Sequence, residues 1–359
     1  MRILQVTPRV APFVGGVETH VREVSRRLQA AGADVSILTL NVGGDLAPQD
    51  TLDGVPVRRV RAHLEAGDLF ASPELYRCVR TGGFDVVHVQ SYHTLVAPTA
   101  MAAAARAHLP FVITFHGGGH TSALRNRIRG AQITMLGPLA RRAAALVAIA
   151  DFEIEHYGRR MRVPEGRWVK IPNGADLPAP SADRQPEPGT LIVSPARLEQ
   201  YKGHQRVLHA LPHVIREVPD ARLWIAGKGP YEEQLRALAT ELGIADRVEI
   251  SVVDRQMLAD RMSSAAVATL VSDFESHPLA ALEAMSLGVP VVVAHNSGMA
   301  ELADRGLARS VATTAAPEAL ATAIVEQIRV PITAAVDIPS WDECTARLLD
   351  LYERVGLRA

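Results

Sequence analysis

The sequence predicts an α/β protein made of two doubly wound domains with parallel sheets. Short, nearly continuous apolar runs alternate with longer amphipathic stretches, as expected for strands buried on both faces between helices. A proline-rich segment at 177–189 interrupts this alternation, which then resumes. The length of 359 residues suits two domains better than one core.

The first half contains six strand-like runs, separated mostly by helical patterns. The first helical pattern, Val17–Ala31, closes with Gly32, a residue that commonly ends helices. Strands that alternate with helices predict right-handed βαβ units in one parallel sheet. We therefore expect a Rossmann-like domain over 1–176. Its strand-like runs are 3–7, 35–40, 85–90, 111–117, 145–150 and 168–174.

The second half repeats the pattern after the linker. The segment 177–189 has four prolines and almost no large apolar residue, which is typical of an extended linker. A second Rossmann-like domain is expected over 190–338, with strand-like runs at 190–194, 221–227, 247–251, 268–272 and 290–294. Ligands of such sheets bind at the carboxyl ends of strands, so two domains of this kind predict a central cleft.

The bulk composition limits the function classes. The net charge of −1 gives no global reason to expect a nucleic-acid partner. Cys78 and Cys344 are isolated and lack metal-ligand spacing, which favours a reducing compartment. The N-terminal apolar run is too short for a secretory signal, and no run approaches the 18 apolar residues of a membrane span. We expect a cytoplasmic protein.

The segment 274–290 carries two carboxylates, Glu275 and Glu283, eight residues apart. On one continuous helix that spacing rises about 12 Å, whereas a glycosidase pair lies roughly 5–9.5 Å apart. Pro278 favours a helix start and Gly288 its end. Glu275 is then expected in the loop before the helix and Glu283 within it.

This helix start is a candidate anion site. Amides around Leu279 and Ala280 would point at whatever lies before the helix, and a helix N-terminus favours a phosphate. The alternative is an ordinary capped helix with two solvated glutamates.

Two further loops of the second half follow strands. Arg197 and Lys202, within 196–204, occupy a strand-to-helix loop from which basic side chains can reach a diphosphate. Gly227, within 226–230, permits a tight turn or a close backbone approach to a ligand. The alternatives are two exposed surface cations and an ordinary turn.

The first half has two glycine loops behind strands. Gly15 and Gly16 open the first helix, although neither the GxGxxG dinucleotide motif nor a GxxxxGK[ST] phosphate loop is present. His116 ends a strand beside three glycines, where it can contact substrate hydroxyls or act as a base. His120 lies four residues on, but the glycines oppose a helix and no third ligand is near, so no metal site is expected.

Taken together, these motifs resemble the retaining glycosyltransferases of family 4, which have the GT-B architecture of two facing Rossmann-like domains. The resemblance covers nearly the whole chain, in the family's order. It rests on GGVETH (15–20), TFHGG (114–118), IPNGAD (171–176), ARLEQYKG (196–203), IAGKGP (225–230), the Glu-x7-Glu stretch of 274–290, SGMAEL (297–302) and the last helix, 340–355, which in that family crosses back onto the first domain. We therefore expect 339–359 to pack on the N-terminal domain.

The resemblance implies transfer of a sugar from a nucleotide sugar, a UDP- or GDP-sugar above all, to an acceptor hydroxyl with retention of configuration. Arg197 and Lys202 would neutralise the leaving diphosphate, and Glu283 would bind the ribose. Glu275 would lie against the donor sugar. No metal is required, because two fixed cations can replace a divalent ion.

Other positions are implied as part of the donor site. His116 would contact the sugar or the reacting region, and Gly16 would border donor and acceptor, beside Gly15. Glu301 matches a family glutamate after the next strand. The sequence departs from the family at 276–278, where Ser-His-Pro replaces a glycine-rich turn, and at Ser297, which replaces one glycine of a pair.

The acceptor is an unidentified sugar, lipid or small molecule. Arginines of the first domain offer a peripheral contact with an anionic membrane, or simply a solvated face. They are Arg125, Arg127, Arg129, Arg141, Arg142, Arg159, Arg160 and Arg162.

The alternatives to a transferase are another GT-B enzyme, such as a nucleotide-sugar epimerase or a sugar phosphorylase, a two-domain sugar-binding protein, and a catalytically silent scaffold. A phosphorylase of the cofactor type needs lysine-bound pyridoxal phosphate, and a solute-binding protein usually needs export. The joint presence of Arg197, Lys202, Glu275 and Glu283 argues against a scaffold.

Overall fold

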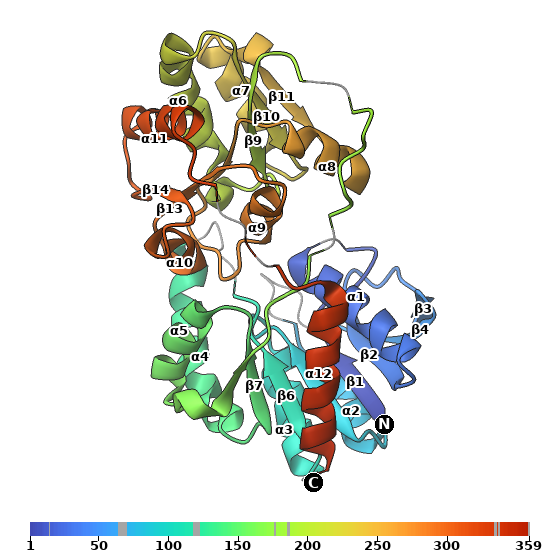
Figure 1. Cartoon of the computed structure of the whole chain (residues 1–359). Coiled ribbons are helices and arrows are strands. Elements are labelled where there is room, and N and C mark those ends of the chain that lie inside the picture. Colours follow the sequence, from blue (N-terminus) through green and yellow to red (C-terminus); the bar gives the residue numbers. More distant parts are fainter. Residues whose placement is uncertain are drawn as a thin grey trace. The chain divides into compact units, whose positions relative to one another are not determined.

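The protein was analysed as a computed structural model, which describes residues 1–13, 15–63, 70–117, 130–175, 177–184, 187–333, 336 and 338–357, and the backbone alone of 123–129. The chain forms two compact units (Figure 1). The N-terminal unit contains Met1–Gly117, Ala123–Gly174 and Pro339–Ala359, and the C-terminal unit contains Ala175–Ile338.

The N-terminal unit is built on an eight-stranded sheet of order β3-β4-β2-β1-β5-β6-β7-β8. All described pairings are parallel except that of β3 with β4. The order reverses between β1 and β5, so a ligand crevice is expected where these strands end. The strands are β1 Arg2–Val6, β2 Asp34–Asn41, β3 Gln49–Leu52, β4 Val55–Arg61, β5 Val86–Gln90, β6 Phe111–Thr114, β7 Ala145–Ala148 and β8 Trp168–Lys170.

Helices cover both faces of this sheet, as a doubly wound fold requires. Alternate residues of β1 face opposite sides, so that Ile3 packs in one core cluster and Leu4 in another. Helices α1 (Gly16–Ala30) and α12 (Trp341–Gly356) complete the Ile3 cluster. The other cluster is completed by α2 Pro73–Thr81, α3 Val96–Arg106, α4 Ala123–Ala140 and α5 Asp151–Met161.

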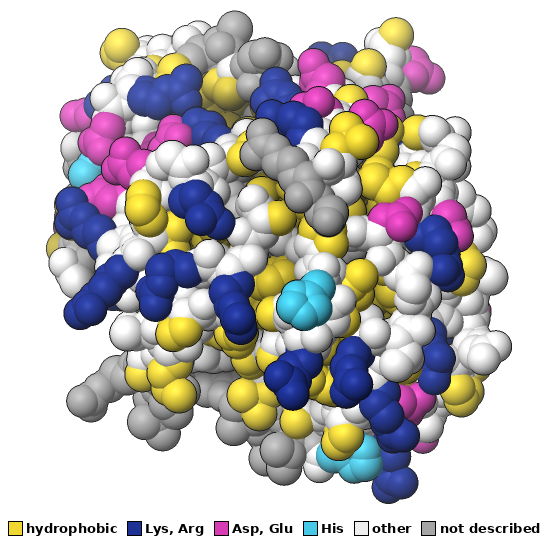
Figure 2. All heavy atoms as spheres, turned by 90° about the horizontal axis from the view of Figure 1, so that it is seen from below, with side chains coloured by type: hydrophobic (Ala, Val, Ile, Leu, Met, Phe, Trp, Pro, Cys, Tyr) yellow, Lys and Arg dark blue, Asp and Glu magenta, His cyan; other side chains and the backbone are white. Residues whose placement is uncertain are grey.

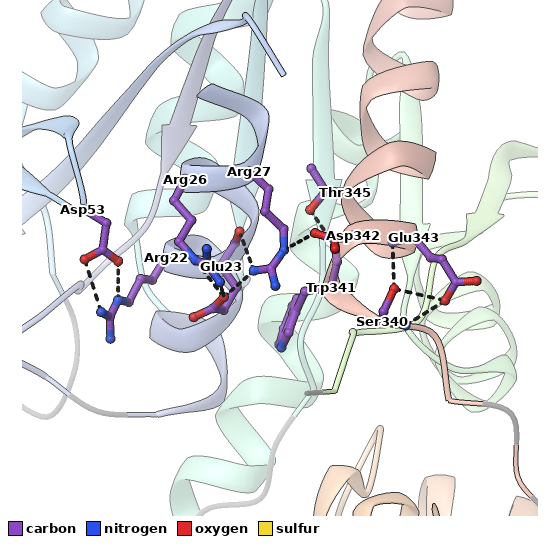
Figure 3. A network of polar contacts seen from close by, with 10 residues as sticks. All are labelled: Arg22, Glu23, Arg26, Arg27, Asp53, Ser340, Trp341, Asp342, Glu343 and Thr345. Atoms are coloured by element: carbon purple, nitrogen blue, oxygen red, sulfur yellow. Dashed lines mark hydrogen bonds and ion pairs between the residues drawn. The ribbon is translucent and has the colours of Figure 1, made fainter. Parts of the chain in front are cut away.

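The C-terminal helix α12 belongs to the N-terminal unit and is anchored to α1 (Figure 3). Arg27 of α1 pairs with Glu23 of its own helix and, at 2.6 Å, with Asp342. Ser340 and Glu343 form a reciprocal capping box that satisfies the first amides of α12. Trp341 is buried, so packing as well as charge holds the helix in place.

The C-terminal unit has a six-stranded parallel sheet of order β11-β10-β9-β12-β13-β14. The first three strands run outward from β9 and the last three outward from β12, which gives the dinucleotide-fold order with its reversal between β9 and β12. The strands are β9 Thr190–Pro195, β10 Ala221–Ala226, β11 Val248–Ser251, β12 Val267–Leu270, β13 Val291–Ala294 and β14 Arg309–Val311.

Helical segments follow these strands. Their bounds are η3 Gln200–Lys202, α6 His204–Glu217, α7 Glu232–Glu241, η4 Ala245–Arg247, α8 Arg255–Ser263, α9 Leu279–Ser286, α10 Ser297–Asp304 and α11 Pro317–Arg329; η2 Glu165–Arg167 precedes β8 in the N-terminal unit. The core of the C-terminal unit is continuous from β9 to α11.

The predicted α/β class is confirmed, and each predicted strand-like run contains a strand. Three strands were missed: β3, β4 and β14. All lie at or next to a sheet edge, where polar side chains are tolerated. In β4 charged residues interrupt the apolar pattern, and β14 contains only Arg-Ser-Val. Among the described residues no helix is both long enough and apolar enough to cross a bilayer.

Candidate functional site

Two loops of the C-terminal unit meet at the reversal of strand order. The loop after β9 carries Arg197 and Lys202, and the loop after β12 carries Glu275. Because β9 and β12 are parallel neighbours, their carboxyl ends lie side by side. The fold thus brings Lys202 and Glu275, which are 73 positions apart in the chain, into contact.

Lys202 and Glu275 form an ion pair between Nζ and Oε1, with side chains only 13% and 16% exposed. Ser272 Oγ donates to the same carboxylate oxygen at 3.1 Å. Burial alone would lower the pKa of Lys202, but attraction to Glu275 outweighs it and holds the pKa above the usual lysine value. Lys202 is therefore a fixed cation at neutral pH.

The loop that carries Glu275 is held by the next loop along the sheet. The Glu275 amide donates to Ser297 Oγ at 2.9 Å, and the Gly298 amide donates to the Glu275 carbonyl at 2.8 Å. A Cβ at Gly298 would lie 2.0 Å from the Ser276 carbonyl oxygen, so only glycine allows this contact. Ser297, a departure from the family pattern, thus supports Glu275 directly.

Arg197 presents a second cation, with a side chain 53% exposed. Its NH2 donates to the Tyr201 hydroxyl at 2.9 Å, and its NH1 lies 2.9 Å from Glu199 Oε1. Lys202 Nζ also lies over the Tyr201 ring, 5.1 Å from the ring centroid. One tyrosine therefore contacts both cations of the loop.

Gly227 lies against this loop. A Cβ there would lie 2.0 Å from the Ala196 carbonyl oxygen, and one at Gly229 would lie 2.3 Å from the Leu198 carbonyl oxygen. The glycines of 226–230 therefore let the loop after β10 pack on the loop that carries Arg197. This contact explains them without a ligand, and a ligand contact of Gly227 stays a prediction.

Helix α9 begins after Pro278 and ends at Ser286, just before Gly288, as predicted. Leu279 and Ala280 form its half-buried first turn.

Glu275 lies in the preceding loop and Glu283 in the helix. The Glu283 side chain is 12% exposed and accepts from Arg255 NH1 at 3.1 Å. Burial raises the pKa of Glu283, and Arg255 opposes part of this effect. The alternative of two solvated glutamates is therefore wrong. Glu301 lies partly exposed in α10.

In the N-terminal unit, His116 follows β6 and is buried in a left-handed backbone conformation, with φ of 48°. Its Nε2 lies 2.7 Å from Gln90 Oε1, and its carbonyl accepts from His93 Nε2 at 3.0 Å. The next amide, of Gly117, donates to the buried Glu153 carboxylate at 2.8 Å. A strained residue held from several sides is typical of a functional site.

His20 of α1 packs edge-on against His116, with ring centroids 4.6 Å apart. Its Nδ1 lies 2.9 Å from Asn173 Oδ1, and burial lowers the pKa of His20 to about 4, so its ring is neutral. Asn173 belongs to the 171–176 segment, whose last residue, Asp176, lies outside the described residues.

Gly174 of the same segment lies against the start of α12. A Cβ at Gly174 would lie 2.5 Å from the Trp341 backbone, so only glycine allows this contact.

Gly15 and Gly16 begin α1 and differ in their surroundings. A Cβ at Gly15 would lie 2.3 Å from the flexible Glu18 carboxylate, whereas one at Gly16 would meet no described heavy atom within 4 Å. Packing among the described atoms therefore does not require glycine at position 16.

Sequence reasoning missed several supporting residues. A signal was present for Gln90 and His88, which are polar residues inside the apolar run 85–90. Asn173 belongs to the IPNGAD motif (171–176), but its contact with His20 could not be foreseen, and no local signal marked Ser272 or Glu153.

The described arginines singled out above lie toward the edge where the parallel strands begin. Arg141 and Arg142 precede β7, and Arg159 and Arg160 occupy the last turn of α5. Figure 2 shows basic side chains spread over one face. Cations near helix C-termini are favoured by the helix dipole, and His116 lies at the other edge. Membrane contact stays a prediction; the side chains of Arg125, Arg127 and Arg129, like His120, lie outside the described residues.

No group of three or more His, Cys, Asp or Glu side chains with metal-binding geometry occurs in the described part of the chain. The chemistry that the described site offers is electrostatic. Arg197 and Lys202 place two cations in the segment after β9, and Glu275 after β12 is paired with Lys202. Glu283 lies in α9, which begins four residues after Glu275. Such groups stabilise charge that develops on a ligand.

Comparison with known proteins assigns the family. The model of Glycosyltransferase Family 4 matches residues 14–178, and that of Glycosyl transferases group 1 matches 180–334. The phosphatidyl-myo-inositol mannosyltransferase of Mycolicibacterium smegmatis is 28% identical over 99% of this chain and 94% of its own length. The GDP-mannose:cellobiosyl-diphosphopolyprenol alpha-mannosyltransferase of Xanthomonas oryzae is 27% identical over 98% and 96%.

Solved structures agree on the fold. Anabaena Alr3699/HepE, solved in complex with UDP and glucose, superposes with a TM-score of 0.74 at 18% identity, over 100% of this chain and 98% of that one. The two family models together span most of the chain, one for each unit. The chain is a member of glycosyltransferase family 4, the glycosyl transferases group 1, with the GT-B architecture.

Proposed function

We propose that this glycosyltransferase moves a sugar, with retention of configuration, from a UDP- or GDP-sugar to an acceptor hydroxyl without a metal ion. The observation that carries the proposal is the ion pair between Lys202 and Glu275 where β9 and β12 end side by side. Arg197 lies in the same segment as Lys202, and α9 begins shortly after Glu275. Anionic diphosphate is the ligand that such a set of groups favours.

The proposed reaction breaks the bond between the sugar C1 and the diphosphate oxygen. Charge grows on that oxygen, and Arg197, Lys202 and the α9 amides stabilise it more in the transition state than in the ground state. The acceptor hydroxyl bonds to C1 from the same face, and its proton passes to the departing diphosphate. Glu275 orients the donor sugar, and Glu283 accepts the ribose hydroxyls.

The N-terminal unit contributes His116 and Gly16 in this proposal. His116 contacts the sugar or the reacting region, and Gly16 borders donor and acceptor. The acceptor is a sugar, lipid or small-molecule hydroxyl. Named relatives include enzymes whose acceptors are a phosphatidyl-inositol and a diphosphopolyprenol-linked sugar. We place the reaction in the cytoplasm, in keeping with the two free cysteines.

Thermal-shift measurements with UDP, GDP, ADP, dTDP and NAD, in a chelator, test the donor site. A ligand at 100 times its Kd adds about 2.7 kcal/mol of stability. For units of this size, each kcal/mol raises Tm by roughly 2–4 °C. One nucleoside diphosphate is expected to stabilise the wild type and not Arg197→Ala. The matched control is Arg329→Ala on α11, an arginine 57% exposed and also paired with a glutamate.

Two outcomes contradict the proposal. Stabilisation by NAD alone, or by a nucleotide only when divalent metal is added, removes the metal-free diphosphate site. Stabilisation that persists in Arg197→Ala but is lost in Arg329→Ala moves the site elsewhere.

A further inference from the structure

A network of buried polar side chains lies inside the N-terminal sheet and reaches His116. Its members come from β1, β5, β6 and α12, and they are Gln5, His88, Gln90, Thr114 and Tyr352. Every one of them is at most 1% exposed. Removing polar groups from water costs free energy, so a buried polar network of this size is expected to serve a purpose beyond stability.

The hydrogen bonds of the network have a defined direction. Gln90 Nε2 donates to Gln5 Oε1 at 2.9 Å, which assigns the amide nitrogen of Gln90 to that side. Its carbonyl oxygen therefore faces His116 Nε2 at 2.7 Å. A carbonyl oxygen only accepts, so His116 Nε2 carries the proton.

The far side of the network secures Gln5 and Gln90. Gln5 Nε2 donates to the Tyr352 hydroxyl at 3.2 Å, and this hydroxyl is also a hydrogen-bond partner of His88 Nδ1. Gln90 Nε2, which only donates, lies 3.2 Å from the same Nδ1, so Nδ1 accepts and the His88 proton is on Nε2, 2.8 Å from Thr114 Oγ1. Burial lowers the pKa of His88 and raises the pKa of Tyr352, so both side chains are neutral at neutral pH.

We infer that Gln90 is a positioning residue that holds His116 as its Nε2–H tautomer, and that Tyr352 of α12 secures Gln90 through Gln5. The inference rests on the proposed function for its effect on transfer. Helix α12 thereby contributes to the site, because the hydroxyl of its Tyr352 takes part in the hydrogen bonds that orient His116. In this tautomer Nε2 is the donor of the His116 ring and Nδ1 is its acceptor.

The first test measures the tautomer itself, by long-range ¹H–¹⁵N NMR on protein labelled at histidine, with the His116 signal assigned from its loss in His116→Gln. The wild type is expected to show the Nε2–H form, and an Nδ1–H form overturns the inference without any further variant. This result does not depend on whether the protein transfers sugar.

The second test replaces the acceptor. Gln90→Met removes the oxygen at similar size, and the His116 signal is expected to lose its pure Nε2–H character. Gln90→Glu keeps an acceptor oxygen and should restore that signal. The control is Gln327→Leu, which removes a fully buried amide in the C-terminal unit and should leave the His116 signal unchanged.

Kinetics separate positioning from general damage. Misplacement of a reacting group commonly costs roughly 10- to 100-fold, so kcat of Gln90→Met should fall by about that factor while the nucleoside-diphosphate Kd stays within about twofold. Wild-type kcat and an unchanged tautomer in Gln90→Met overturn the inference. If the wild type itself transfers no sugar, the proposed function fails, and the NMR result still decides the tautomer.

Discussion

Lys202 of the segment after β9 and Glu275 of the loop after β12 form an ion pair, although they lie 73 positions apart in the chain. In the proposed reaction, a diphosphate that binds Lys202 must compete with this carboxylate. We therefore expect the pair to hold the cation in place before the donor binds, and donor binding to release Glu275.

This competition predicts opposite effects on binding and transfer. Glu275→Gln should bind the nucleoside diphosphate more tightly, by roughly tenfold or about 1.4 kcal/mol, because Lys202 loses its competing charge. Transfer should fall by about 100-fold, since an amide cannot provide the charge beside the sugar. Isothermal calorimetry and a transfer assay give the two numbers. Asp151→Asn, in an exposed pair with Lys170, is the control, and weaker binding by Glu275→Gln contradicts the competition.

Gly16 offers a test that separates folding from function. Since a Cβ there meets no described atom within 4 Å, Gly16→Ala should not lower Tm, and the helix propensity of alanine favours a gain of up to about 1 kcal/mol. If substrate approaches this backbone, transfer should fall by at least tenfold. Thermal unfolding and kcat/KM measure the two effects. Full activity in Gly16→Ala would remove Gly16 from the site.

The buried Glu283 predicts a pH effect. Its pKa is raised in the folded protein above the ordinary 4.5, so the ionised form costs stability, and that cost grows as pH rises from 4.5 through the folded pKa. Glu283→Gln should lack this fall in Tm with rising pH. If the carboxylate accepts the ribose hydroxyls, nucleotide affinity should drop below the folded pKa in the wild type only.

A comparison of the two proteins across pH also removes the titration of the phosphate, which both share. If Tm and nucleotide affinity change with pH in the same way in the wild type and in Glu283→Gln, then Glu283 neither lowers stability at higher pH nor binds the ribose.

His20 predicts an acid-sensitive fold. Burial lowers its pKa from 6.5 to about 4, so the unfolded chain takes up the proton first as pH falls. The contribution of the neutral His20 ring to the free energy of unfolding is then fully present above pH 6.5. It decreases by on the order of 3 kcal/mol as pH falls from 6.5 to about 4. His20→Gln should flatten this part of the curve of Tm against pH.

Much of the fold could be predicted from the sequence, because its signal is local. Apolar runs such as 111–117 and 290–294 identify buried strands, and Pro278 with Gly288 marks the bounds of α9 within a residue or two. Because parallel strands expose their following loops at one edge, the loops with Arg197, Glu275 and His116 could be named as site candidates.

The sequence by itself therefore determined the fold class, the repeat of the βα pattern and the loops that follow each strand. Only the tertiary structure decided which side chains meet. The Lys202–Glu275 pair depends on β9 and β12 being neighbours, and the Gln90–His116 contact depends on β5 lying beside β6. Likewise, Tyr352 reaches His88 only because α12 packs on the N-terminal sheet. Hydrophobic periodicity records which face of an element is buried, but it carries no information about which distant residue lies opposite.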